Sequence, residues 1–251
     1  MRGRRAPHLV AEGDELSLHF ERSQVQSRMH RAEPNRLVLD YTRTMMGFLL
    51  LHPTPARIVM IGLGGGSLAK CCRCELPEAD FTAVELSADV IALRDVFGIP
   101  PDGPRFRVVC GDGAAYVGTG VGLAPLWDVL LVDGFDGGGQ PSSLCSAAFY
   151  DACASRLRDG GVLVVNLNAD ATGYGSYARR IRDAFDGNLV VVETEDRQNK
   201  IVFARKGGPV PSLDVLLDRA GALGAARFPI SLAETARAMD GARSGGKGGR
   251  R

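Results

Sequence analysis

The sequence of 251 residues lacks a strong charge excess and a long apolar segment. Its formal net charge is only +1, whereas a nucleic-acid partner usually calls for a clear basic excess. No apolar run approaches the ~18 residues that cross a bilayer, and no apolar core of signal-peptide length follows the basic N-terminus. We therefore expect a cytoplasmic protein with no nucleic-acid partner and no membrane partner.

The cysteines lack the spacing of a metal site. Three of them fall in the run KCCRCEL, but helical positions 71, 72 and 74 do not converge on one point. No second Cys/His pair with zinc spacing occurs. We interpret all six as reduced thiols and predict no metal: Cys71, Cys72, Cys74, Cys110, Cys145 and Cys153.

Apolar patterning divides the chain into three parts. Between Leu16 and Tyr41, the alternating segments LSLHF, QVQSRM and RLVLDY predict a small antiparallel sheet after a loose start at residues 1–13. TRTMMGFLLL (42–51) has helical length, and the following HPTP ends it. We predict an N-terminal β segment with a linking helix (1–53), a catalytic domain (54–206), and a C-terminal extension (207–251) with one helix (212–223) and a disordered tail.

Strands alternate with helices throughout residues 54–206. Buried segments such as RIVMI, FTAVEL and WDVLLV are each followed by a stretch of helical character, which predicts a mostly parallel sheet. LVVVETED and NKIVFARK are joined by Arg197-Gln198-Asn199, and so short a connection can only make an antiparallel hairpin. This order predicts an α/β protein with a Rossmann-like, class I methyltransferase fold rather than a dehydrogenase domain.

A glycine loop follows the first strand of this domain. IVMIGLGGGS places Gly62, Gly64 and Gly66 between a buried strand and a helix, where a tight turn and a close ligand leave no room for side chains. The start of the helix also offers free N–H groups. A glycine-rich turn without a ligand is the alternative for this loop taken alone.

Two acids narrow the ligand to an adenosine compound. Glu85 ends the second strand, where a carboxylate can accept both ribose hydroxyls. Asp112 ends the third strand, where it can accept the adenine amino group, a contact that dinucleotide domains do not need. Ser67 also departs from the dinucleotide fingerprint. The site therefore favours an S-adenosyl compound, and a surface carboxylate and an Asp-Gly turn are the alternatives.

Asp133 and Asp136 follow the fourth strand in VDGFDG. Ligands of open α/β sheets lie beyond the carboxyl ends of the strands, so both carboxylates should face the same crevice as the glycine loop. Their charge would attract a cationic amine, and one of them could remove its proton before it attacks. Turn capping by both acids is the alternative.

The chain resembles the spermidine synthase family, the polyamine aminopropyltransferases, from roughly Glu21 to Lys206. SQVQ, IGLGGGSLAK, AVELSADVI, CGDGAAY and VDGFDGGGQPSSLCSAAFYDACASRLRDGGVLVVN match family segments in order. The resemblance implies that Asp133 is the catalytic acid/base, that Asp136 and Tyr41 bind the amine, and that homodimers form. It implies cofactor-binding roles for Gln26, Gly62, Gly64, Gly65, Gly66, Glu85, Asp112 and Gly113.

Two departures bear on the reaction. Gly65 stands where the family has a loop aspartate, which holds the aminopropyl amine and should repel the carboxylate of undecarboxylated S-adenosylmethionine. LDYTRTMM (39–46) replaces an acidic polyamine-binding segment; it keeps Tyr41 but introduces Arg43, which a cationic diamine tolerates only if Arg43 turns away. Packing and a solvated charge are the alternatives for these two side chains.

Four hypotheses follow. The first is aminopropyl transfer from decarboxylated S-adenosylmethionine to a small amine such as putrescine. The second is methyl transfer from S-adenosylmethionine to an unknown small molecule, which Gly65 and the altered 39–46 segment favour. The others are a non-catalytic cofactor-binding protein, which loss of turnover in Asp133→Asn with retained cofactor affinity would exclude, and a dinucleotide oxidoreductase, which absence of nicotinamide binding would exclude.

Overall fold

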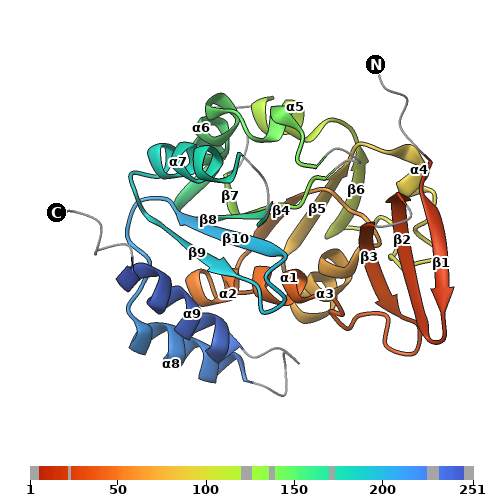
Figure 1. Ribbon diagram of the computed structural model, residues 1–251, viewed down its shortest axis with the longest axis horizontal. Helices are drawn as coiled ribbons and strands as arrows, with labels where there is room; N and C mark the ends of the chain where they lie inside the picture. Colours follow the sequence, from red (N-terminus) through yellow and green to blue (C-terminus); the bar gives the residue numbers. More distant parts are fainter. Residues whose placement is uncertain are drawn as a thin grey trace.

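The computed structural model describes residues 6–21, 24–119, 126–135, 139–169, 173–224 and 232–245. Within these residues the chain forms a small antiparallel sheet, β1-β2-β3, and a seven-stranded sheet in the order β6-β5-β4-β7-β8-β10-β9 (Figure 1). The strands are β1 His8–Glu12, β2 Glu15–Glu21, β3 Gln24–His30, β4 Arg57–Ile61, β5 Asp80–Glu85, β6 Phe106–Cys110, β7 Trp127–Val132, β8 Leu157–Asn168, β9 Leu189–Glu193 and β10 Asn199–Arg205.

The large sheet confirms the predicted fold class. Strands β4 to β8 pair in parallel, whereas β10 pairs antiparallel with both β8 and β9. The closing hairpin therefore adds β10 next to β8 and leaves β9 at the edge. Because the carboxyl ends of β4, β5, β7 and β8 lie along one rim of the sheet, groups that follow these strands come together there.

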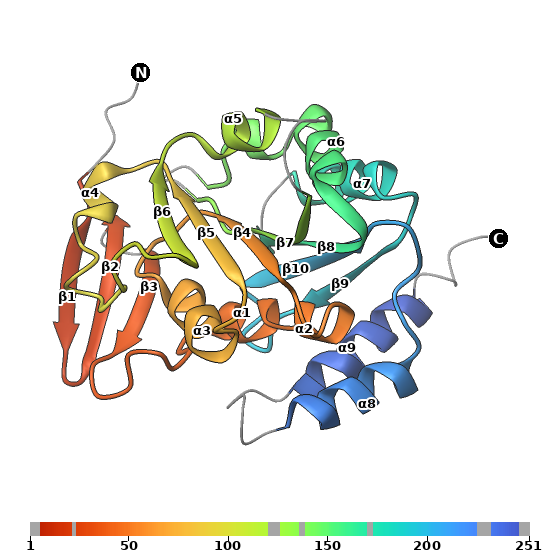
Figure 2. The same ribbon diagram turned by 180° about the vertical axis from the view of Figure 1, so that it is seen from behind.

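Helices cover both faces of the large sheet (Figure 2). Helices α5, α6 and α7 lie over one face, α1, α2 and α3 lie over the other, and α9 packs against β9. None of the helices in the described part of the chain is long and apolar enough to cross a bilayer. The helices are α1 Asp40–Met45, α2 Phe48–Leu51, α3 Ser67–Glu75, α4 Ala88–Ile91, α5 Gly113–Gly118, α6 Ala147–Arg156, α7 Tyr174–Ala184, α8 Leu213–Leu223 and α9 Leu232–Gly245, with a 3-10 turn at Ser142–Leu144.

Alternate residues of the central strand β4 enter two separate apolar clusters. Ile58 and Met60 pack in the cluster on the side of the small sheet, whereas Val59 and Ile61 pack in the cluster with α6 and α7. This is the two-residue period of a strand buried on both faces, and it explains why the segment reads as a continuous apolar run. The glycine loop therefore follows directly from a strand that is held on both of its faces.

The N-terminal sheet differs from its prediction in one strand. RLVLDY is not a strand; its last two residues begin α1, and the Leu37 and Val38 carbonyls accept hydrogen bonds from Arg43. The third strand is instead β1, within residues expected to be loose. A tight turn at Gly13, with φ +56°, joins β1 to β2 and lets them pair as an antiparallel hairpin. The alternation of apolar residues alone did not reveal this pairing.

Two helical regions also differ from expectation. The predicted helix 42–51 is two short helices, α1 and α2, because the chain turns at Met46–Gly47. The C-terminal extension holds α9 in addition to the predicted helix, which is α8. Leu216 and Met239 from these helices belong to the same apolar cluster as β4. The prediction of a disordered tail (241–251) is wrong for its first five residues, because α9 continues to Gly245; the rest of the tail lies outside the described residues.

The buried Lys70 links α3 to the small sheet through its ammonium group. Its side chain is 2% exposed, and its ammonium donates to the Phe97 carbonyl at 2.7 Å and to the Met29 sulfur at 3.0 Å. Burial away from water lowers the pKa of Lys70 to about 8. The contact joins β3, α3 and the segment after α4 at a position next to the glycine loop.

Lys70→Met is expected to change how stability depends on pH. The unfolded chain keeps the lysine proton up to a pKa of about 10.4, whereas the folded chain releases it near pH 8. Between these values the unfolded state binds more protons, so the free energy of unfolding of the wild type should rise with pH relative to the variant. Urea denaturation at pH 7 and pH 9.5 measures this difference. Lys200→Met, at a partly exposed lysine, is the control, and an equal difference at both pH values for Lys70→Met would contradict the prediction.

A candidate active site at the carboxyl rim of the sheet

A cavity of about 2180 Å³ lies where the carboxyl ends of β4, β5, β7 and β8 face β2, β3, α1 and the β9–β10 turn. Gly65 and Gly66 belong to the glycine loop but are not among the residues of its wall. Asp136 lies outside the described residues. The other predicted site residues all line the cavity: Gln26, Tyr41, Gly62, Gly64, Glu85, Asp112, Gly113 and Asp133.

The glycine loop needs small residues for reasons of packing as well as space for a ligand. Gly62 has φ +93°, and a Cβ there would lie 2.3 Å from the Asp133 carbonyl oxygen. Gly66 has φ +69° and packs against Ile99, which a Cβ would approach to 2.5 Å. A Cβ on Gly64 would meet nothing closer than 3.6 Å, and Gly64 lines the cavity. Of these three glycines only Gly64 would accept a Cβ without overlap, although its φ of +53° still favours glycine.

Gly65 lies against two neighbouring side chains. A Cβ there would be 2.6 Å from the Ser27 hydroxyl and 2.9 Å from the Phe97 ring. Ser27 is buried in β3, next to the predicted cofactor residue Gln26, and both residues line the cavity. The space that a larger residue at position 65 would enter is thus filled by Ser27 and Phe97.

Glu85 links the glycine loop to the end of β5. One of its oxygens accepts the Leu63 N–H at 2.9 Å and the other accepts the Ser87 N–H at 2.8 Å. A carboxylate oxygen has two acceptor sites, so each oxygen keeps one for a ribose hydroxyl. Glu85 therefore sets the shape of the loop while still offering acceptors to the cavity.

Asp112 is both a helix cap and a wall of the cavity. Its Oδ1 accepts the Ala115 N–H at 2.8 Å and so caps α5. The residue is exposed, and its second oxygen is not needed for the cap. Gly113 follows it and packs against Ile61. A Cβ at position 113 would lie only 2.2 Å from the nearest methyl group of Ile61. The turn and ligand interpretations of the Asp-Gly pair are therefore compatible.

Asp133 is held by neutral hydrogen-bond donors from two other elements. The Asn166 amide donates to its Oδ1 at 2.8 Å, and the Tyr41 hydroxyl also donates to it. Burial raises the pKa of Asp133 to about 6, against the two hydrogen bonds, which lower it; the charge of Glu85 adds to the rise. Burial, and then the neighbouring Asp133 carboxylate, raise the pKa of Tyr41 well above its ordinary value. Asp133 is thus a carboxylate that can take up a proton near neutral pH.

Asn166 was not identified from the sequence. It lies within β8, directly after the buried run GVLVV, and is 2% exposed. The signal available in the sequence was a polar residue at the end of this apolar run. No group of three or more side chains suited to hold a metal ion occurs among the residues that the structure describes.

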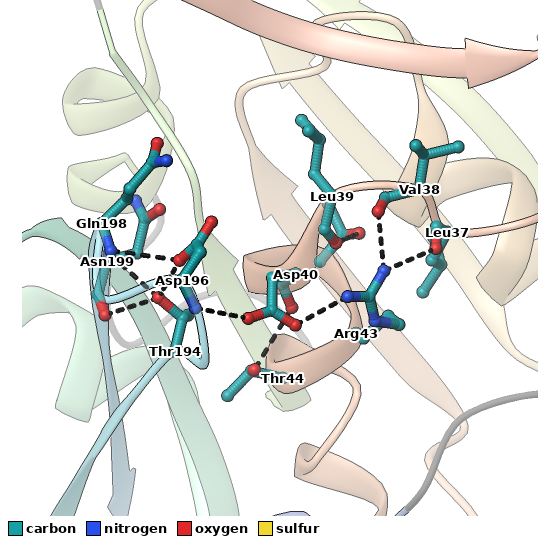
Figure 3. Close-up of polar contacts among 11 residues, drawn as sticks. Leu37, Val38, Leu39, Asp40, Arg43, Thr44, Thr194, Asp196, Gln198 and Asn199 are labelled. Carbon is teal, nitrogen blue, oxygen red and sulfur yellow. Dashed lines mark hydrogen bonds and ion pairs between the residues drawn. The ribbon is translucent and has the colours of Figure 1, made fainter. Parts of the chain in front are cut away.

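Arg43 turns toward its own helix (Figure 3). Its guanidinium donates to the Val38 carbonyl at 2.6 Å and the Leu37 carbonyl at 3.2 Å, and it pairs with Asp40 at 2.7 Å. The Asp40 carboxylate also accepts the Asp196 N–H from the β9–β10 turn at 3.1 Å. Arg43 is therefore neutralised by Asp40, and together they fix α1 to the turn.

The described wall of the cavity carries more acidic than basic side chains. The basic ones are Arg28, Arg43 and Arg197. Glu195 and Asp196 come from the β9–β10 turn and were not identified from the sequence. Such an excess of negative charge attracts cations into the cavity. The acidic side chains of the wall are Asp40, Glu85, Asp89, Asp112, Asp133, Glu195 and Asp196.

No family model matches the chain. Curated relatives match most of it. A polyamine aminopropyltransferase of Neisseria meningitidis serogroup A is 36% identical over 215 residues, which cover 84% of this chain and 81% of the relative. A polyamine aminopropyltransferase of Chromobacterium violaceum is 38% identical over 199 residues, which cover 79% and 75%. The chain belongs to the polyamine aminopropyltransferase family.

Solved structures share the fold of this aminopropyltransferase. A probable spermidine synthase from Corynebacterium glutamicum superposes with a TM-score of 0.70 at 21% identity, covering 87% of this chain and 84% of that one. Human methyltransferase-like protein 13, in complex with SAH, gives 0.66 at 23%, covering 79% and 93%. A spermidine synthase in complex with the transition state analogue AdoDATO gives 0.62 at 20%, covering 81% and 74%. The methyltransferase-like fold is thus shared across both kinds of enzyme.

Proposed function

We propose that this aminopropyltransferase moves an aminopropyl group from decarboxylated S-adenosylmethionine to a small amine such as putrescine, in polyamine biosynthesis. The observation that carries the proposal is the Asp133 carboxylate, held by Tyr41 and Asn166 at the wall of a cavity rich in acids. The family membership supports aminopropyl transfer. The similar spermidine synthase structure, which is in complex with the transition state analogue AdoDATO, supports a co-substrate derived from S-adenosylmethionine.

In this proposal the glycine loop, Glu85 and Asp112 hold the adenosine. Glu85 offers acceptors for the ribose hydroxyls, Asp112 offers one for the adenine amino group, and Gln26 and Gly113 line the same cavity. Because the loop is anchored to β5 and packs against the backbone of Asp133, a co-substrate bound there would bring its sulfonium toward Asp133. Positioning of this kind supplies much of the rate in a displacement between two bound reactants.

Asp133 acts as the base in the transfer. The amine nitrogen attacks the methylene carbon beside the sulfonium; a C–N bond forms as the C–S bond breaks, and methylthioadenosine leaves with the electron pair. The amine loses one proton, which Asp133 accepts. A carboxyl group with a pKa of about 6 is ionised at pH 7 and can still take up this proton. Asp136 and Tyr41 are proposed to bind the amine.

Methyl transfer from S-adenosylmethionine is the second candidate, and Gly65 is the observation that favours it. A loop without an acid at position 65 does not repel the carboxylate of the undecarboxylated cofactor. The cytoplasmic location and the homodimer expected from the sequence stay predictions.

Incubation of the protein with putrescine and each cofactor in turn separates the two candidates. We expect spermidine and methylthioadenosine from decarboxylated S-adenosylmethionine, detected by mass spectrometry, and no methylated product from the carboxylated form. Absence of methylthioadenosine with the decarboxylated cofactor, together with methylated putrescine from the other, would replace aminopropyl transfer by methyl transfer.

A further inference from the structure

We propose that Asn166 and Asn199 form a positioning pair that keeps Asp133 oriented and ionised for proton uptake. The inference rests on the proposed role of Asp133 as the base. Asn199 does not bond Asp133 directly. Its Nδ2 donates to the Asn166 Oδ1 at 2.8 Å, and the Asn166 Nδ2 donates to the Asp133 Oδ1, also at 2.8 Å. The two amides thus form a directed chain that ends on the carboxylate.

Sheet register brings the three residues together. Val132 of β7 pairs with Val165 of β8, so Asp133 and Asn166 are the next residues along two parallel neighbours. Asn166 pairs with Ile201 of β10, two residues from Asn199, which is within the diagonal reach of side chains on one face of an antiparallel pair. The antiparallel position of β10 between β8 and β9 is therefore what supplies the second amide.

The direction of the chain matters because an amide has one donating and one accepting end. With Asn199 donating to its oxygen, Asn166 must present its N–H groups to Asp133, and this arrangement favours the charged carboxylate. If both amides turned over, the Asn166 oxygen would face Asp133, and only a protonated carboxyl group could donate to it. The pair can accommodate both protonation states, and the orientation in the structure is the one that matches the ionised base.

The β9–β10 turn holds Asn199 in place (Figure 3). The Asn199 N–H donates to the Thr194 hydroxyl at 3.1 Å, and its carbonyl accepts the Thr194 N–H at 2.9 Å. The Thr194 hydroxyl also lies 2.6 Å from Asp196, whose N–H reaches Asp40 on α1. Helix α1 also carries Tyr41, the second donor to Asp133. The same helix therefore contacts both the β9–β10 turn and the proposed base.

The titratable groups that act on Asp133 come from two elements besides its own strand. Tyr41 on α1 donates to the carboxylate, and Glu85 at the end of β5 opposes its charge. Asn166 is the neutral donor from β8. Removing the Asn199 donor should weaken the stabilisation of the charged form, while the effects of Tyr41 and Glu85 stay as they are.

Asn199→Leu tests the pair, since leucine has a similar size but no donor. The acid limb of kcat/KM for putrescine is expected to move up by about one pH unit, which lowers the rate about fivefold at pH 6 and leaves it nearly unchanged at pH 8.5. Taking the ratio of variant to wild type cancels the titration of the amine itself. Recovery at high pH is the signature of a positioning role, because damage to the fold would lower the rate at every pH.

The controls use the same strand and a direct measurement. Lys200→Met changes the next residue of β10, whose ammonium lies 4.4 Å from the Tyr174 ring, and it should leave the acid limb unchanged. Carbon-13 NMR of labelled aspartate, assigned with Asp133→Asn, gives the pKa of Asp133 without any substrate. Asn199→Asp keeps the shape if the leucine variant does not fold, and it should raise the same pKa.

An Asp133 pKa that is equal in the wild type and both variants would overturn the positioning pair. A failure of the proposed function would look different. In that case the wild type would form no methylthioadenosine, although the pKa of Asp133 would still change when Asn199 is substituted. A rate that falls equally at pH 6 and pH 8.5 would also overturn the pair.

Discussion

Asp133→Asn is expected to slow methylthioadenosine formation by a factor on the order of 10²–10⁴ at pH 7.5, with nearly unchanged affinity for the adenosine part of the co-substrate. The amide has the shape of the carboxylate but cannot take up the amine proton. The glycine loop depends on the backbone of residue 133, not on its side chain, so the adenosine site should persist. Single-turnover kinetics measure the chemical step, and calorimetry measures the affinity.

A matched change from acid to amide gives the control. Asp214 is exposed on α8 and is not among the residues of the cavity wall, and Asp214→Asn should leave turnover unchanged. The wild type should also lose activity below about pH 6, where Asp133 becomes protonated. Full turnover in Asp133→Asn would remove Asp133 as the base.

Gly62→Ala is expected to lower the free energy of unfolding by about 3 kcal/mol, from the left-handed backbone and from overpacking together. The new methyl group would lie 2.3 Å from the Asp133 carbonyl oxygen, so the ends of β4 and β7 must separate. That movement displaces the proposed base as well as the loop, and turnover should fall at least about 100-fold, as expected for a misplaced catalytic group. Urea denaturation and single-turnover kinetics test the two effects.

Gly98→Ala separates backbone strain from close approach. Gly98 also has a positive φ, +63°, but a Cβ there would meet nothing within 4 Å. The Gly98→Ala variant should lower the free energy of unfolding by about 1 kcal/mol, from the strain of the left-handed conformation alone, and leave turnover close to that of the wild type. Equal losses of stability in the two variants would show that the contact between Gly62 and Asp133 has no energetic importance.

Much of the large α/β sheet could be predicted because its signals are local. A buried strand, a glycine turn and an acid at the next strand end are neighbours in sequence, so Gly62, Glu85 and Asp133 could be named without knowing the strand order. Asn166 and Asn199 could not be named in the same way. Their roles depend on the register between β7, β8 and β10, which no single segment of the sequence carries.

In the N-terminal region, a clear local pattern gave a wrong prediction. RLVLDY alternates as a strand should, yet the Leu37 and Val38 carbonyls bond to Arg43 instead of to a neighbouring strand. The three-stranded sheet has the order β1-β2-β3, so β3 still offers an edge, but the backbone of RLVLDY bonds to Arg43 rather than to that edge. Alternation predicts that a segment can pair, but the other hydrogen-bond partners of its backbone decide whether it does.

The crowding at Gly65 has a consequence for how this protein can change over generations. A change of Gly65 to aspartate in one step would place its Cβ 2.6 Å from the Ser27 hydroxyl and 2.9 Å from the Phe97 ring. Such a step is accommodated only if Ser27 and Phe97 move or have changed. The glycine is thus retained by its neighbours, and substitutions at positions 27 and 97 would determine which residues position 65 accepts.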